Sequence, residues 1–276
     1  MTLAATWCSY EPPAPPRLWM ASDSRISDDE APLIDQGLKL FEVPIICRAP
    51  GPTGFFDQIV FESAIGLVAA GGSLVFQHVY GSLVPLLANL IRPVPVVPST
   101  SQLASFVGRV MTIYVRSLGH RRHDAGRVMI IVGGESLTGQ ASAYKLIPQV
   151  DTQDLLEFVP MQLELADGVV HFIGDRTDEA QSMYRDIAMR DEPGASRQRA
   201  ALNVIRNFID DPEIPSVGGE VQIGYSAGGR FRRVASVVPG TEPPPSRSRY
   251  LLNSIDLEEL GSVGDCALGI DAVAIV

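Results

Sequence analysis

Three residues in the first forty positions constrain the fold of this chain most. Thr2 opens an apolar segment, Asp23 ends a second one, and Lys39 follows sixteen positions after the aspartate. Removal of the initiator methionine would give Thr2 a free α-amine beside its own hydroxyl. A hydroxyl is a weak nucleophile until a base takes its proton. An α-amine, with an unperturbed pKa of about 7.7–8.0, is a usable base near neutral pH.

The other two residues suit the same chemistry. A lysine ammonium close to the α-amine would lower the pKa of the amine further, because like charges repel. Asp23 could hold that lysine in place and offset its charge. We therefore predict a fold that brings Thr2, as nucleophile and base, against Asp23 and Lys39.

The arrangement resembles the proteasome β-subunit family of N-terminal-nucleophile hydrolases, of the bacterial proteasome homologue type, which includes the ancestral β-subunit homologues. Three pieces carry the resemblance: Thr2 at the start of a strand, the Ala-Ser-Asp-Ser-Arg run at 21–25, and the Gly-Leu-Lys-Leu run at 37–40. It covers about residues 2–238. It implies an α+β fold, a four-layer αββα sandwich of two mainly antiparallel sheets between helical layers.

Hydrophobic patterning gives the order of elements independently of the resemblance. Apolar runs bounded by glycine and proline predict strands, and apolar steps of three and four predict helices. The predicted order is strands, two helices, strands, two helices and strands. The strands are expected at 2–8, 17–23, 43–47, 64–70, 128–132, 144–147, 169–173, 221–225 and 231–238, and the helices after 71–73, after 99–101, at 177–189 and at 200–209. A proline-rich linker at 243–246 divides a domain at 1–240 from a C-terminal extension at 241–276.

The resemblance also suggests supporting residues. A backbone N–H near Gly71 would stabilise the oxyanion at the start of a helix, where developing negative charge is favoured. Asp175 stands where the family has a serine in a Gly-Ser-Gly turn. Ser216, before Gly218 and Gly219, matches a further family serine in outline. These departures put efficient peptidase activity in doubt.

The resemblance implies a threonine-type peptidase that hydrolyses peptides or unfolded proteins inside a self-compartmentalising ring of identical subunits. In the family, an ATP-dependent unfoldase or cap commonly controls access to the ring. Two alternatives stay open. The chain could be a catalytically weak or inactive structural subunit of such a ring, which retention of Met1 would favour. It could also be an acylase that cleaves a small amide.

Composition excludes other classes of protein. The net charge is −10 and no long block of basic residues exists, so we expect no nucleic-acid partner. The three cysteines are scattered, which favours reduced thiols in the cytoplasm over a disulfide framework. No signal peptide is expected. Residues 63–91 lack charge, but polar side chains and a Gly-Gly-Ser break argue against a membrane span.

Two further motifs carry little weight. The Gly-Tyr-Ser-Ala-Gly run at 224–228 matches a nucleophile elbow, but a strand rather than a helix is predicted after it, and no histidine follows His171. His120 and His123 could hold a metal, but two arginines between them favour a basic loop. We therefore expect no metal and no cofactor.

Overall fold

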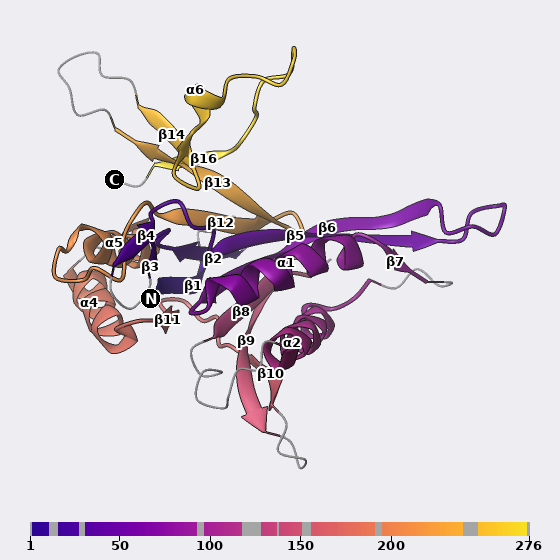
Figure 1. Cartoon of the computed structure of the whole chain (residues 1–276), viewed down its shortest axis with the longest axis horizontal. Helices are drawn as coiled ribbons and strands as arrows, with labels where there is room; N and C mark the ends of the chain where they lie inside the picture. The colour runs from indigo at the N-terminus through magenta and orange to yellow at the C-terminus, as the bar shows by residue number, and fades with distance from the viewer. Residues whose placement is uncertain are drawn as a thin grey trace.

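The computed structural model describes residues 2–10, 16–27, 31–92, 97–117, 128–136, 138–150, 156–190, 195–239 and 248–274. Within these ranges the strands form three sheets. His120, His123 and the linker at 243–246 lie outside the described residues. Figure 1 shows the course of the chain.

The first sheet has eight strands and contains the start of the chain. Its order is β11-β1-β2-β12-β13-β14-β15, and β16 also pairs with β13. Strand β1 lies between β11 and β2 and is antiparallel to both. The bounds are β1 (Leu3–Ser9), β2 (Arg17–Ser22), β11 (Val170–Gly174), β12 (Gln222–Ala227), β13 (Arg230–Val238), β14 (Arg249–Leu252), β15 (Ile255–Asp256) and β16 (Ala272–Ala274).

The second sheet has six strands in the order β10-β9-β8-β6-β5-β7. Its bounds are β5 (Leu40–Ala49), β6 (Gln58–Ala70), β7 (Leu90–Ile91), β8 (Met129–Glu135), β9 (Ala141–Val150) and β10 (Leu156–Gln162). The third sheet is a small pair, β3 (Ile26–Ser27) and β4 (Pro32–Ile34).

Helices cover parts of both large sheets. Helices α1 (Ser73–Leu87) and α2 (Thr100–Ser117) share one apolar core with the second sheet. Helices α4 (Thr177–Arg190) and α5 (Ala195–Asp210) share another core with the first sheet. A short helix, α6 (Leu257–Leu260), lies in the C-terminal segment.

A third core joins the two large sheets. It contains Leu18 and Met20 of β2, Ile131 of β8 and Phe231 of β13, all fully buried. Gly66 and Gly133 lie opposite each other on β6 and β8. A Cβ at Gly66 would lie 2.6 Å from the Phe231 ring, and a Cβ at Gly133 would lie 2.4 Å from Met20. The two sheets can pack this closely because both positions lack a side chain.

The predicted four-layer αββα sandwich of two sheets is wrong. The described residues form three sheets, and one of them curls into a half-barrel. The physical reason is that the segment predicted as an extension adds strands to the first sheet. Strands β14 and β16 both pair with β13, and β15 pairs with β14. Whether residue 240 divides two domains stays a prediction.

The hairpin of β5 and β6 extends far beyond the rest of the second sheet. Strand β8 pairs with β6 only from Gly66 to Ala70, and β7 pairs with β5 only at Cys47 and Arg48. Residues 49–62, called the arm below, therefore form a two-stranded ribbon that projects from the body (Figure 1).

The uncharged segment at 63–91, predicted as a strand and a helix and not as a membrane span, forms the end of β6, then α1 and β7. Across the described ranges, no helix combines the length and apolar character that a membrane span requires.

Candidate functional site

The centre of the candidate site is a buried ion pair between Asp23 and Lys39. Asp23 follows the last residue of β2, and Lys39 precedes the first residue of β5, so the pair joins the two large sheets. The Lys39 Nζ atom lies 2.9 Å from each carboxylate oxygen of Asp23. The side chains are 7% and 0% exposed, respectively. The predicted proximity of these two residues is therefore present.

The Asp23 carboxylate is also held by the backbone. Leu3 N–H donates to Oδ1 at 3.1 Å, and the N–H groups of Arg25 and Gly218 each donate to Oδ2 at 3.2 Å. A buried carboxylate is stable only when its oxygens are hydrogen-bonded. These donors fix the carboxylate. Because Leu3 is one of them, the residue directly after Thr2 is held against Asp23.

Burial moves the pKa values of the two partners toward each other. It lowers the pKa of Lys39, and the Asp23 carboxylate opposes this change. It raises the pKa of Asp23, and the Lys39 ammonium with the N–H groups of Gly218 and Leu3 opposes that change. The Lys39 ammonium therefore gives up a proton more readily than a surface lysine does.

Thr2 directly precedes β1 of the first sheet. It is 4% exposed, and its carbonyl oxygen accepts a hydrogen bond of 2.7 Å from Asp175 N–H. Leu3 lies opposite Gly174 of β11, and Ala4 opposite Ser22 of β2. The register of β1 therefore sets Thr2 at the same end of the first sheet as Asp23.

Gly174 allows this close approach. Its φ is +109°, and a Cβ there would lie 1.8 Å from the Thr2 carbonyl oxygen and 3.3 Å from the Ala70 Cβ. The end of β6 therefore meets the start of β1. Gly71 follows directly with φ +100°, and α1 begins two residues later at Ser73. The structure thus places the predicted oxyanion region beside Thr2.

Asp175 and Ser216 contact each other. Ser216 Oγ donates to Asp175 Oδ2 at 2.7 Å, and the backbone of Asp175 holds Thr2 as described above. The structure therefore gathers all six predicted residues at one end of the two sheets. What each of them does in a reaction stays a prediction.

Sequence reasoning missed Gln222. Its Oε1 accepts hydrogen bonds of 3.0 Å from the N–H groups of both Lys39 and Leu40, and its Nε2 donates to Gly37 O at 2.7 Å. The side chain is buried and fixes the backbone of Lys39 from β12. The available signal was a polar residue between the apolar residues Val221 and Ile223 at the start of a predicted strand.

Ser24 and Ser254 were also missed. Ser24 Oγ contacts Asp35 O at 2.5 Å and Ser254 Oγ at 3.0 Å, and it accepts from Glu220 N–H at 2.7 Å. Ser254 belongs to the turn between β14 and β15, so the C-terminal strands contact the residue next to Asp23. A sequence gives no local signal for such a contact between positions 230 residues apart.

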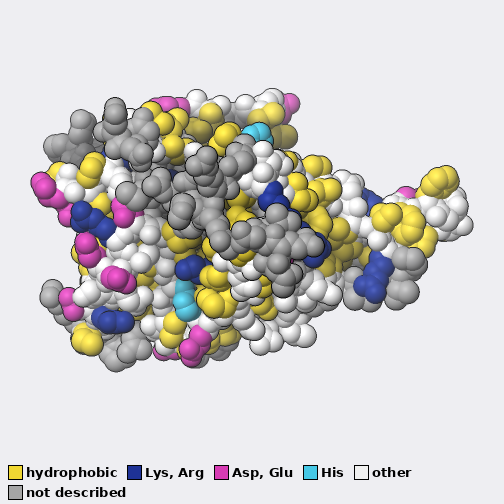
Figure 2. All heavy atoms as spheres, turned by 60° about the horizontal axis from the view of Figure 1, so that its bottom comes forward, with side chains coloured by type: hydrophobic (Ala, Val, Ile, Leu, Met, Phe, Trp, Pro, Cys, Tyr) yellow, Lys and Arg dark blue, Asp and Glu magenta, His cyan; other side chains and the backbone are white. Residues whose placement is uncertain are grey.

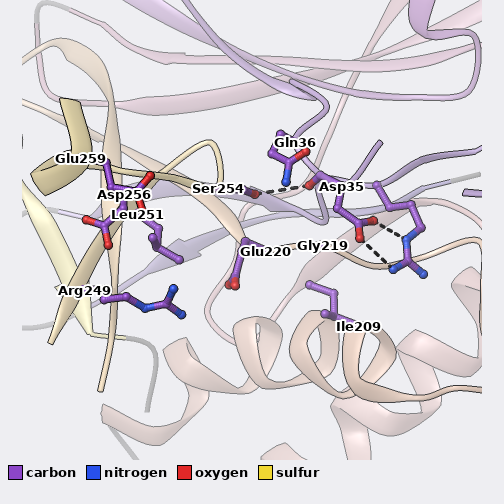
Figure 3. Close-up of a pocket in the computed structure, with 11 residues that line it drawn as sticks. Asp35, Gln36, Ile209, Gly219, Glu220, Arg249, Leu251, Ser254, Asp256 and Glu259 are labelled. Atoms are coloured by element: carbon purple, nitrogen blue, oxygen red, sulfur yellow. Dashed lines mark hydrogen bonds and ion pairs between the residues drawn. The ribbon is translucent and has the colours of Figure 1, made fainter. Parts of the chain in front are cut away.

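A polar cavity of about 430 Å³ lies next to this turn (Figure 3). Its lining includes the Arg25–Asp35 ion pair, with Glu220, Arg249 and Glu259 around it. Thr2, Asp23 and Lys39 are not among the lining residues. The cavity therefore adjoins the candidate site at Arg25 but is not lined by the three central residues.

Among the described residues, no cluster of three or more His, Cys, Asp or Glu side chains could hold a metal ion. Ser226, the serine of the elbow-like run, is buried and accepts a hydrogen bond from Leu18 N–H at 3.0 Å. It lies on β12, which turns directly into β13. This serine therefore has a structural role in the sheet.

Comparisons with known proteins give a fold likeness only. No protein-family model matches the chain, and no curated protein matches it. The helical assembly of the Anbu complex from Pseudomonas aeruginosa is similar, with a TM-score of 0.53 and 19% identity over 85% of this chain and 86% of that chain. Anbu, the ancestral beta-subunit, from Yersinia bercovieri has a TM-score of 0.53 and 16% identity over 84% and 86%.

These comparisons correct the family assignment made from the sequence. The similar structures are ancestral β-subunits, which are proteasome-like in fold but distinct from the proteasome β-subunits themselves. No family model supports membership of the N-terminal-nucleophile hydrolases. At this identity the likeness extends to the fold alone.

Proposed function

We propose that this chain is an N-terminal-threonine amidohydrolase that cleaves peptides and works as a homo-oligomer. The observation that carries the proposal is the buried Asp23–Lys39 pair, whose carboxylate is hydrogen-bonded to the residue directly after Thr2. A buried charged pair costs free energy unless it is well paired, so its presence is often functional rather than stabilising.

The reaction uses residues at this end of the sheets. After removal of Met1, the Thr2 Oγ attacks the substrate carbonyl while the Thr2 α-amine accepts the hydroxyl proton. Lys39 keeps the pKa of the amine low, and Asp23 orients Lys39. The backbone N–H of Gly71 donates to the oxyanion. The amine returns the proton to the leaving amine, and water then hydrolyses the acyl ester.

A hydrolysis assay with matched variants tests the proposal. Wild-type protein should cleave members of a peptide library, and Thr2→Ala should remove that activity. Thr6→Ala is the control, because Thr6 lies on the same strand and its hydroxyl bonds to Trp19 O. A panel of small amides in the same assay identifies an acylase. Activity that survives Thr2→Ala would refute Thr2 as nucleophile.

One observation favours a second function, a structural subunit with weak catalysis. The Asp175 backbone N–H donates to the Thr2 carbonyl oxygen, so an acidic residue is hydrogen-bonded directly to the candidate nucleophile residue. A negative charge there would favour the protonated amine and oppose an oxyanion. Under this alternative, Asp175→Ser should raise the hydrolysis rate. Under the first proposal, the wild-type protein hydrolyses peptides without this substitution.

A further inference from the structure

The arm exposes apolar side chains along its length. Phe55 at its tip is 74% exposed, Ile59 is 53% exposed and Val60 is 39% exposed. Figure 2 shows hydrophobic side chains at the end of this projection. An isolated two-stranded ribbon is marginally stable in water, and a long exposed strand edge invites pairing with another chain. The arm therefore has the features of a surface that binds another protein chain.

A cavity of about 420 Å³ lies at the base of the arm, between β7 and α2. Cys47, Leu90, Ile91 and Pro98 supply apolar surface to it, while Arg92 and Arg109 supply positive charge. A cavity of this size and mixed lining suits one aromatic side chain and an adjacent acid. The Arg109 guanidinium lies 5.4 Å from the centre of the Phe106 ring, which holds it at the edge of α2.

The tip of the arm is complementary to this cavity. Phe55 supplies the aromatic group, and Asp57, two residues further on, supplies the acid. The tip cannot reach the cavity of its own chain, because the β5–β6 ladder leads directly away from Cys47. If the arm tip is the occupant of this cavity, it therefore comes from a second copy of the chain.

We propose that the arm of one copy inserts Phe55 into the cavity of a second copy, where Asp57 pairs with Arg92 and Arg109. Each copy contributes its arm to one neighbour and its cavity to another. Such a head-to-tail contact builds a ring if it closes and a helical filament if it does not. This inference rests on the homo-oligomeric part of the proposed function and not on its chemistry.

Assembly mass measured by light scattering and native mass spectrometry tests the inference on the full chain. Phe55→Ala should raise the dissociation constant about 30-fold, as loss of a central aromatic anchor does. Arg109→Glu, which changes only the cavity, should do the same. Met189→Ala is the control, because Met189 is 82% exposed on α4, away from the arm. Circular dichroism confirms that each variant is folded.

A mixing experiment distinguishes arm-to-cavity docking from arm-to-arm pairing. The Phe55→Ala protein keeps an intact cavity, and the Arg109→Glu protein keeps an intact arm. Their mixture should form a one-to-one dimer that neither variant forms alone. Arm-to-arm pairing predicts instead that Arg109→Glu assembles normally.

A monomeric wild-type protein would overturn the proposed interface. An unchanged assembly mass for Phe55→Ala or Arg109→Glu, or the lack of a dimer on mixing, would also overturn it. Dissociation of the Met189→Ala assembly would overturn it as well. Acylation of Thr2 in the same samples separates this result from the proposed chemistry. Unmodified Thr2 in an arm-dependent assembly would refute only the catalytic proposal.

Discussion

At the scale of single residues, the Asp23–Lys39 pair has the largest energetic consequence. Asp23→Asn would keep the shape of the side chain but leave the Lys39 ammonium buried beside a neutral amide. Breaking a buried pair in this way costs about 3–5 kcal/mol. We expect that loss in the free energy of unfolding, measured with urea.

The exposed pair of Arg176 and Glu179 is the matched control for this change. Its side chains are 41% and 61% exposed, so Glu179→Gln should cost less than about 1 kcal/mol. Equal effects of Asp23→Asn and Glu179→Gln would show that water reaches the Asp23–Lys39 pair.

Gly174 gives a second prediction at this scale. Gly174→Ala would put a Cβ 1.8 Å from the Thr2 carbonyl oxygen, on a backbone with φ +109°. Both the strain and the collision act against folding, so we expect a loss of at least about 2 kcal/mol in unfolding free energy. Gly228→Ala, at φ +60° with no neighbouring atom within 4 Å, should show the smaller cost of backbone strain alone.

Cys8 gives a prediction about pH. Burial raises the pKa of its thiol to about 11 from an ordinary value of 9.0. The folded state therefore favours the neutral thiol more than the unfolded chain does. The contribution of this preference to the free energy of unfolding is fully present below pH 9 and is lost as the pH rises through about 11. At pH 8, a thiol reagent should modify the exposed Cys266 and spare the buried Cys8 and Cys47. Rapid modification of Cys8 in folded protein would contradict this burial.

At the scale of elements, contact between the two large sheets depends on glycine. Gly133→Ala would put a Cβ 2.4 Å from Met20 and 2.5 Å from Leu18 on β2. Overpacking of a core costs about 1–3 kcal/mol, and we expect that loss in thermal or chemical unfolding.

Gly81→Ala on α1 is the control for this change, because no atom lies within 4 Å of the added Cβ. Alanine in a helix interior should raise the stability by about 0.5–1 kcal/mol. Opposite signs for the two substitutions would support the close sheet contact. A neutral Gly133→Ala would argue that the sheets pack further apart.

Local patterns predicted the order of the elements but not their ends. Strand β6 was expected at 64–70 and instead begins at Gln58, because pairing with β5 extends the ladder through polar and exposed positions such as Glu62. Strands β14 to β16 are two to four residues long. Their pairing with β13 and with one another leaves no periodic pattern in so short a run.

The candidate site, too, was predicted in part from the sequence. The family resemblance, which includes the spacing of Asp23 and Lys39, predicted that these two side chains meet. The N–H groups of Leu3 and Gly218 that complete the carboxylate could not be predicted, since every residue except proline carries that donor. Gln222 could have been suspected from its polarity, but its target depends on how two sheets approach each other.

At the scale of the whole molecule, the site exists because distant segments end at the same place. The start of β1, the end of β2, the segment before β5, the end of β6 and the end of β11 meet around Thr2. The arm projects away from that end in Figure 1. The proposed chemistry and the proposed self-association therefore use different parts of the fold and can be tested independently.

The central claim is that Thr2, freed at its α-amine, is the nucleophile beside Asp23 and Lys39. The most direct test is peptide mass spectrometry after incubation with an acylating β-lactone probe. The account predicts that the first peptide begins at Thr2 and carries one probe mass, and that Lys39→Ala slows this modification about 100-fold or more. A first peptide that begins at Met1, or a probe mass on any other residue, would contradict the account.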